Sequence, residues 1–241
     1  AALAGLDAYV AVDIYLNETT RHADVILPPP SSLQKGHYDL ALLQLAVRNV
    51  ANYSPPVLPL DPDQPDEWEI LARLALIAQG LGPDADPAVV DDLVVGTLVQ
   101  AAVADAHSPV HGRDPADLLA ALGPRRGPER LLDLLLRTGP YGDGFGARHD
   151  EVAPGVPPLS LDVLLDRPHG VDLGPLAPRL PEVLRTPSGQ VELDAEPVLA
   201  DLPRLAAALD RPVPDAVLVG RRDLRSNNSW MHNVEVLVKG R

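Results

Sequence analysis

The sequence predicts an α/β fold that opens on parallel strands. Two short apolar runs rich in β-branched residues, Tyr9–Ile14 and 23–27, are separated by a polar stretch with room for only one or two helical turns. Runs that are apolar on both sides are typical of strands buried on both faces of a parallel sheet. Helical periodicity dominates after residue 66. Strands followed by amphipathic helices therefore indicate the α/β class.

Polar residues follow the first predicted strand at once. Asp13 stands at its carboxyl end, and Asn17-Glu18-Thr19-Thr20 supplies a cap and an early acid for the short crossover. In open α/β sheets, ligands bind outside the carboxyl ends of the strands. We therefore expect Asp13 at a ligand-binding edge. Prolines 28–30 end the second strand and lead into a loop that carries Lys35.

The next segments are assigned from periodicity and capping. Residues 39–50 have helical spacing, although an extended arm remains an alternative. Residues 52–64 are proline-rich and predicted to be extended. Two firm helices follow, 67–79 with Asp66 as its cap, and 87–106. Asp91-Asp92 is interpreted as a solvated part of the second helix. The expected apolar face of that helix is Val89, Val90, Leu93, Val94, Leu98, Ala101 and Ala102.

The rest of the chain is more irregular. Short helices are predicted at 114–122, 128–137 and 160–166, each opened by a capping residue or proline. The glycine-rich stretch 141–146 is interpreted as a flexible connection and not as a phosphate-binding loop, because a helix precedes it. The remaining predictions are a turn and strand at 186–193, a partial helix at 197–209 and a strand at 214–221.

Composition excludes several classes of site. The net charge of −14 argues against nucleic-acid binding, which needs clustered Lys and Arg. The absence of cysteine excludes disulfides, zinc–thiolate sites and iron–sulfur clusters on this chain. No apolar run reaches the length of a transmembrane helix, and residues 1–7 lack the charged start of a signal peptide. We therefore expect a cytoplasmic protein without a membrane segment.

Several motifs together resemble the molybdopterin oxidoreductases, bacterial enzymes that carry bis-molybdopterin guanine dinucleotide. In that family an apolar strand ends in Asp, Thr-Glu-Thr follows, and Ala-Asp-Val-Val-Leu-Pro leads to a loop ending in Glu-Lys-Gly. The matching residues here are Val12-Asp13, Asn17-Glu18-Thr19, Ala23-Asp24-Val25-Ile26-Leu27-Pro28 and Gln34-Lys35-Gly36. Pro65-Asp66-Glu67-Trp68-Glu69-Ile70 is similar to the family's Pro-Asp-x-Trp-x-Ile, and Thr186-Pro187-Ser188-Gly189-Gln190-Val191-Glu192-Leu193 to its Thr-Pro-Ser-Gly-Lys-Ile-Glu-Leu. Gln34 and Gln190 replace the usual Glu and Lys, and His37-Tyr38-Asp39 replaces the usual Gly-Thr-x-x-Asn.

The resemblance implies a fold and a cofactor. Residues 1–182 would be the later part of a doubly wound α/β domain with a helical insertion, and 183–241 a linker and the start of a C-terminal β-barrel domain that binds the molybdopterin dinucleotide. Asp13, Lys35 and Asp66 would contact the guanine nucleotide. A polar loop after the strand 214–221 would wrap the pterin and pyrophosphate, with Arg225 and Asn228 as the first choices for direct contacts. The residues assigned to that part of the site are Gly220, Arg221, Arg222, Leu224, Arg225, Ser226, Asn227, Asn228, Trp230, Met231 and His232.

The resemblance also implies that the chemistry lies elsewhere. The parent enzyme would transfer two electrons at molybdenum or tungsten, with the metal-ligating residue and any iron–sulfur cysteines upstream of Ala1, and could work with a redox partner subunit. We predict no catalytic residue on this chain, because it has no Gly-x-Ser-x-Gly, no Cys nucleophile and no His-Glu-x-x-His. We predict no metal ligand, because Pro109 breaks the helix that would align His107 and His111. The chain alone is predicted to be inactive and to fold poorly. The alternative is a non-catalytic, acidic, helical interaction module derived from such an enzyme.

Overall fold

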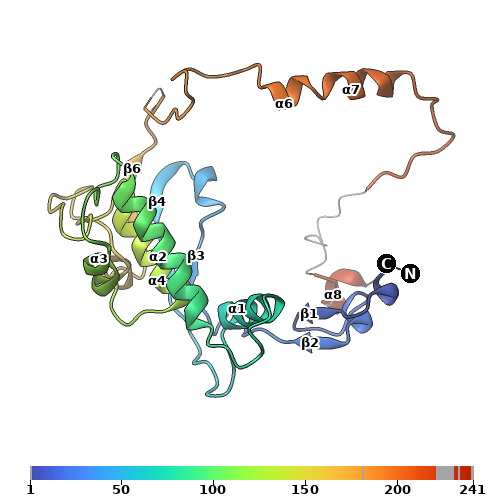
Figure 1. Cartoon of the computed structure of the whole chain (residues 1–241), viewed down its shortest axis with the longest axis horizontal. Helices are drawn as coiled ribbons and strands as arrows, with labels where there is room; N and C mark the ends of the chain where they lie inside the picture. Colours follow the sequence, from blue (N-terminus) through green and yellow to red (C-terminus); the bar gives the residue numbers. More distant parts are fainter. Residues whose placement is uncertain (1, 181, 221–230, 233, 240–241) are drawn as a thin grey trace. The chain divides into compact units, whose positions relative to one another are not determined.

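The computed structural model describes residues 2–180, 182–220, 231–232 and 234–239 (Figure 1). The chain divides into two compact units, Ala1–Ala177 and Pro178–Arg241. The first unit contains small sheets and the longer helices, and the second contains short helices. The chain is therefore a mixed α/β protein, and each unit is described by itself.

The predicted strand–turn–strand opening is present. Strand β1 (Val10–Val12) pairs in parallel with β2 (Val25–Leu27), with Val10 opposite Val25, and a 3-10 turn (Thr20–His22) lies in the crossover. The predicted burial on both faces is wrong, since Val10 and Val25 are 43% and 47% exposed and only Ala11 is buried. In the described ranges, β1 and β2 form a two-stranded sheet, which leaves much of these side chains in solvent.

The helix predicted over residues 39–50 is also wrong. A 3-10 turn occupies Leu43–Leu45, and β4 (Arg48–Ala51) pairs antiparallel with β6 (Val171–Pro175). The extended alternative therefore holds for residues 48–51. Arg48 Nη2 forms an ion pair with Asp172 Oδ2 at 2.8 Å across this pair. The partner strand lies so far along the chain that local periodicity could not detect it.

Each helix of the first unit begins within one residue of its predicted start. They are α1 (Glu67–Ala78), α2 (Ala88–Ala104), α3 (Pro115–Ala121), α4 (Gly127–Thr138) and α5 (Leu161–Leu165). The side chains of Asp66, Asp114 and Ser160 accept backbone N–H groups of the first turns of α1, α3 and α5. These bonds satisfy donors that a helix start otherwise leaves free. The short pair β3 (His37–Tyr38) and β5 (Tyr53–Ser54) completes the unit.

The predicted apolar face of α2 differs from the buried one. The helix buries Asp91, Val95 and Val99, while Val89, Leu93, Val94 and Leu98 are exposed. Asp91 is therefore not solvated, and its Oδ2 accepts a hydrogen bond from Arg130 Nη1 of α4 at 3.0 Å. Asp92 is exposed, as predicted. The ion pair to α4 fixes which side of α2 faces inward.

Helix α4 lies between two hydrophobic cores. Leu132 and Leu136 belong to the core that includes β4, β5 and α5, and Leu134 belongs to the core that includes α2 and α3. Between these leucines lies Asp133, whose side chain is fully buried. Its carboxylate accepts hydrogen bonds from Arg137 Nε at 3.1 Å, Arg125 Nη1 at 3.3 Å and the backbone N–H of Leu161 at 2.8 Å.

The glycine-rich stretch 141–146 is a connection, as predicted, and it is tied to α4. Arg137 Nη1 donates to Asp143 Oδ2 at 2.7 Å, and the Arg137 guanidinium lies 5.3 Å from the centroid of the Phe145 ring. Gly142 forms a β-bridge with Leu159. The stretch therefore positions Phe145 against the α2–α3 core and shows no helix at its end.

The second unit contains α6 (Glu196–Leu199), α7 (Leu202–Leu209) and α8 (Glu235–Val238). The predicted turn forms around Gly189, whose φ is +65° and whose N–H donates to Thr186 O. The strands predicted at 191–193 and 214–221 are absent from the described part of those ranges. The chain there is exposed and does not pair with any strand. Arg221 lies outside the described residues. In the described ranges of the chain, neither a doubly wound sheet nor a barrel is formed.

In the described ranges of the chain, none of the helices combines the length and apolar character that crossing a membrane requires.

Replacing Asp133 by Ala should destabilise the first unit strongly. The change leaves the guanidinium groups of Arg125 and Arg137 and the N–H of Leu161 without a shared acceptor. Breaking a buried ion pair typically costs about 3–5 kcal/mol. Urea denaturation of the full chain measures the effect. The matched variant Asp117→Ala removes an exposed carboxylate and should change the free energy of unfolding by only about 0.5 kcal/mol. Equal effects of the two variants would show that Asp133 does not hold the unit together.

Candidate functional site

The loop that carries Lys35 packs against the start of α1. Lys35 Nζ forms an ion pair with Glu67 Oε2, although the two residues are 32 positions apart. Beside it, Gln34 Nε2 donates to Pro59 O at 3.2 Å and to Gln64 Oε1 at 3.3 Å. The side chains of Lys35 and Glu67 are 31% and 41% exposed. Two of the sequence-predicted stretches thus lie side by side, with their charged groups accessible to solvent.

Asp66 caps α1 within a capping box. Its Oδ1 accepts the N–H of Glu67 at 2.6 Å, and Glu69 Oε2 accepts the N–H of Asp66 at 2.9 Å. Burial raises the pKa of Asp66 above its usual value, and the carboxylates of Glu69 and Glu67 raise it further. The hydrogen bond from Glu67 N–H and the charge of Lys35 oppose that rise. Lys35, Asp66, Glu67 and Glu69 therefore form one electrostatically coupled group, the Lys35 cluster.

Asp13 follows β1 directly, at the strand end where it was predicted. Its N–H donates to Leu27 O of β2 at 3.3 Å. Its carboxylate accepts from Tyr15 N at 2.9 Å and from Asn17 Nδ2 at 3.1 Å. Asn17 in turn accepts the N–H of Thr20, a buried residue. Asp13 thus holds the crossover between β1 and β2. Across the described ranges, no hydrogen bond or ion pair joins it to Lys35 or Asp66.

The predicted polar loop is mostly beyond the described structure. Gly220 is described, exposed and outside any helix or strand. Met231 and His232 lie in a turn shortly before α8. The predicted cofactor contacts of this loop therefore stay predictions. The predicted residues that lie outside the described ranges are Arg221, Arg222, Leu224, Arg225, Ser226, Asn227, Asn228 and Trp230.

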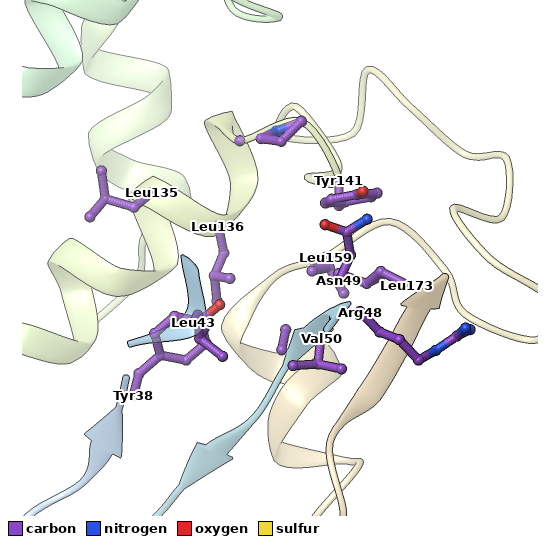
Figure 2. Close-up of a pocket in the computed structure, with 13 residues that line it drawn as sticks. Tyr38, Leu43, Arg48, Asn49, Val50, Leu135, Leu136, Tyr141, Leu159 and Leu173 are labelled. Carbon is purple, nitrogen blue, oxygen red and sulfur yellow. The ribbon is translucent and has the colours of Figure 1, made fainter. Parts of the chain in front are cut away.

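Two hollows lie along α4, and sequence reasoning did not predict them. The first, of about 240 Å³, lies between α4 and β4 and is shown in Figure 2 with Leu136, Val50 and Tyr141 among its lining residues. The second, of about 220 Å³, is shared between α4 and the segment around β3. Tyr38 and Leu135 line both. Asp13, Lys35 and Asp66 line neither, so the predicted site and these hollows are separate features.

The second hollow contains a polar pair. Tyr53 Oη donates to Glu129 Oε1 at 2.6 Å. Burial and the Glu129 carboxylate raise the pKa of Tyr53 above its usual range. Gly36, which follows Lys35, lies so close that a Cβ there would be 2.0 Å from Tyr53 Oη. Position 36 therefore requires glycine because a larger side chain would clash with Tyr53. Residues 76 positions apart make the pair, so no local signal could have found it.

Neither a metal-binding group nor a known relative adds to the description of this site. In the described ranges, no group of three or more His, Cys, Asp or Glu side chains could hold a metal ion. No protein-family model, curated protein or solved structure matches the chain. The functional interpretation therefore depends on the motifs and on the contacts between them.

The role of Asp66 as a cap can be separated from its charge. Asp66→Ala should destabilise α1 by about 1 kcal/mol, because Ala cannot accept the N–H groups of the first turn. Asp66→Asn keeps an acceptor and removes a negative charge beside Glu67 and Glu69, so it should be neutral or slightly stabilising at pH 7. Thermal unfolding of the full chain measures both variants.

The pH dependence of the Asn variant has a definite sign. A carboxyl whose folded-state pKa is raised binds more protons when folded, so it lowers stability as pH rises through that pKa. The stability of Asp66→Asn relative to the native chain should therefore increase as pH rises from about 3 through the raised pKa towards 7. A relative stability that falls over this range would contradict the assignment.

Proposed function

We propose that this chain is a segment of a molybdopterin-dependent oxidoreductase and that it contributes binding contacts to the guanine nucleotide end of bis-molybdopterin guanine dinucleotide. In the parent enzyme the chain would be a cofactor-binding part without catalytic residues. The proposal starts from the resemblance of several short motifs, and one structural observation supports it.

That observation is the Lys35 cluster. The family resemblance assigns two motifs to the nucleotide: the loop ending at Lys35 and the segment at Asp66. They are adjacent in space and are joined by the ion pair of Lys35 with Glu67. The ammonium group of Lys35 also acts on the pKa of Asp66. An interaction module has no need to bring these two motifs together, whereas a nucleotide site must. The half-exposed side chains leave both accessible to a ligand.

The chemistry of the cluster fits the nucleoside end of the cofactor. Carboxylates accept hydrogen bonds from ribose hydroxyls and from the N–H groups of guanine, and an ammonium group pairs with phosphate. The cluster contains three carboxylates and one ammonium group, so it does not suit a pyrophosphate by itself. The arginines of segment 221–233 would supply that contact. When bound, the cofactor supplies the two-electron chemistry of its molybdenum or tungsten.

The finer architecture belongs to the same proposal. The parallel pair β1–β2 would be the edge of a doubly wound sheet completed by the parent chain, and residues 183–241 would lead into a β-barrel domain. The chain divides into its two compact units between Ala177 and Pro178, a few residues before the proposed boundary. An iron–sulfur cluster upstream, a redox partner subunit and a cytoplasmic location complete the proposal.

The test measures the cofactor in the complete native protein. Acid hydrolysis should release guanosine monophosphate together with molybdenum or tungsten, quantified by chromatography and by elemental mass spectrometry. Lys35→Gln should lower the guanosine monophosphate content several-fold, because losing a charge-assisted contact costs about 1.5–3 kcal/mol.

The matched control is Lys239→Gln. Lys239 is the chain's other lysine and is exposed in the second unit, so its replacement should leave the cofactor content unchanged. A native protein that contains neither guanine nucleotide nor metal would overturn the proposed function. Equal cofactor content in the two lysine variants would overturn the role of Lys35.

A further inference from the structure

Helix α2 carries apolar residues around its whole circumference. Between Asp92 and Asp105 it carries no charged residue. Only the side that bears Asp91, Val95 and Val99 is buried. A helix that is hydrophobic all round is normally buried on all sides. The other side of α2 therefore has the composition of a core surface in a solvent-exposed position.

The exposed side forms one continuous surface, here called the α2 outer face. Its large residues are Val89 (57% exposed), Leu93 (67%), Val94 (42%) and Leu98 (38%). At 100° per residue these positions lie within one half of the helix, which also presents Thr97, Gln100 and Ala101. The Thr97 hydroxyl donates to its own helix at Leu93 O, at 2.7 Å. The outer face is therefore mainly apolar, with the exposed Gln100 as a polar side chain near one edge.

Acidic residues lie at both ends of the α2 outer face and favour a partner with basic residues. Exposed Asp84 and Asp86 lie before the helix and exposed Asp105 follows it, and the last turn has no basic residue to offset the negative end of the helix dipole. At the start of the helix, Asp92 is paired with Arg126 and Arg130, so Asp84 and Asp86 dominate that end.

These charges disfavour two occupants. A second copy of the chain would bring a net charge of −14 against another −14 and acidic ends against acidic ends. A membrane surface is disfavoured because interfacial helices use Lys and Arg to approach anionic lipids. An amphipathic helix with an apolar stripe and basic residues near both ends matches the face in shape, in polarity and in charge.

We propose that the α2 outer face is a docking surface for an amphipathic helix of a partner protein that carries Lys or Arg near both ends of its apolar stripe. Leu93, the most exposed large residue of the face, would be the central contact. This surface is independent of the Lys35 cluster, so the proposal stands or fails separately from the proposed function.

Once circular dichroism shows that the 241-residue chain is folded, it offers a direct assay because it contains no cysteine. Leu93→Cys can be labelled with one environment-sensitive fluorophore, and a label at Leu16→Cys, on the exposed crossover of the β1–β2 pair, serves as the control. The probes are two helical peptides with the same leucine stripe, one with lysines and the other with glutamates in its first and last turns. Binding is measured with unlabelled variants by calorimetry and with labelled ones by emission shift.

We expect the lysine peptide to bind in a one-to-one complex, at least about tenfold more tightly than the glutamate peptide, and to shift emission at position 93 and not at position 16. Leu93→Gln should weaken binding about tenfold, as removal of one buried leucine predicts, while Leu16→Gln should not. Absence of binding, equal binding of the two peptides, or binding unaffected by Leu93→Gln would overturn the proposal. Dimerisation that Leu93→Gln abolishes, or adsorption of position 93 to phosphatidylserine vesicles, would also overturn it in favour of another occupant.

Discussion

The first unit depends on one buried charge. Asp133 is fully enclosed between two cores, where an unpaired carboxylate would cost several kcal/mol. It is tolerated because Arg125, Arg137 and the N–H of Leu161 all bind it. The same bonds fix the segment before α4, the body of α4 and the start of α5. Since Arg137 also holds Asp143 and Phe145, the connection after α4 is positioned from the same point.

The features predicted from sequence are those with local causes. Asp66, Asp114 and Ser160 bind the first turns of their own helices, so the starts of α1, α3 and α5 could be read from neighbouring residues. The features missed have distant causes. Strand β4 exists because β6 lies beside it, and the helical spacing of residues 39–50 carries no information about β6. For α2, periodicity could not select a face on a helix that is apolar all round, and the Asp91–Arg130 ion pair selected it.

The candidate site also combines features with local causes and features with distant causes. Asp13, Lys35 and Asp66 were identified from short motifs, but only the fold shows that Lys35 reaches Glu67 beside Asp66. Asp13 holds its strand-end position and binds its own crossover through Tyr15 and Asn17, a local role that a motif match does not reveal. The strands predicted at 191–193 and 214–221 needed a pairing partner, and the described chain offers none. Their formation would depend on the barrel of the parent protein.

The proposed function predicts that three segments of this chain become protected when the cofactor is bound. Hydrogen–deuterium exchange of the complete native protein, compared before and after release of the cofactor, tests this prediction most directly. We expect faster exchange after release in residues 28–36, in the first turn of α1 and in residues 221–233. Unchanged exchange in these segments, or changes confined to other parts of the chain, would contradict the proposed cofactor contacts.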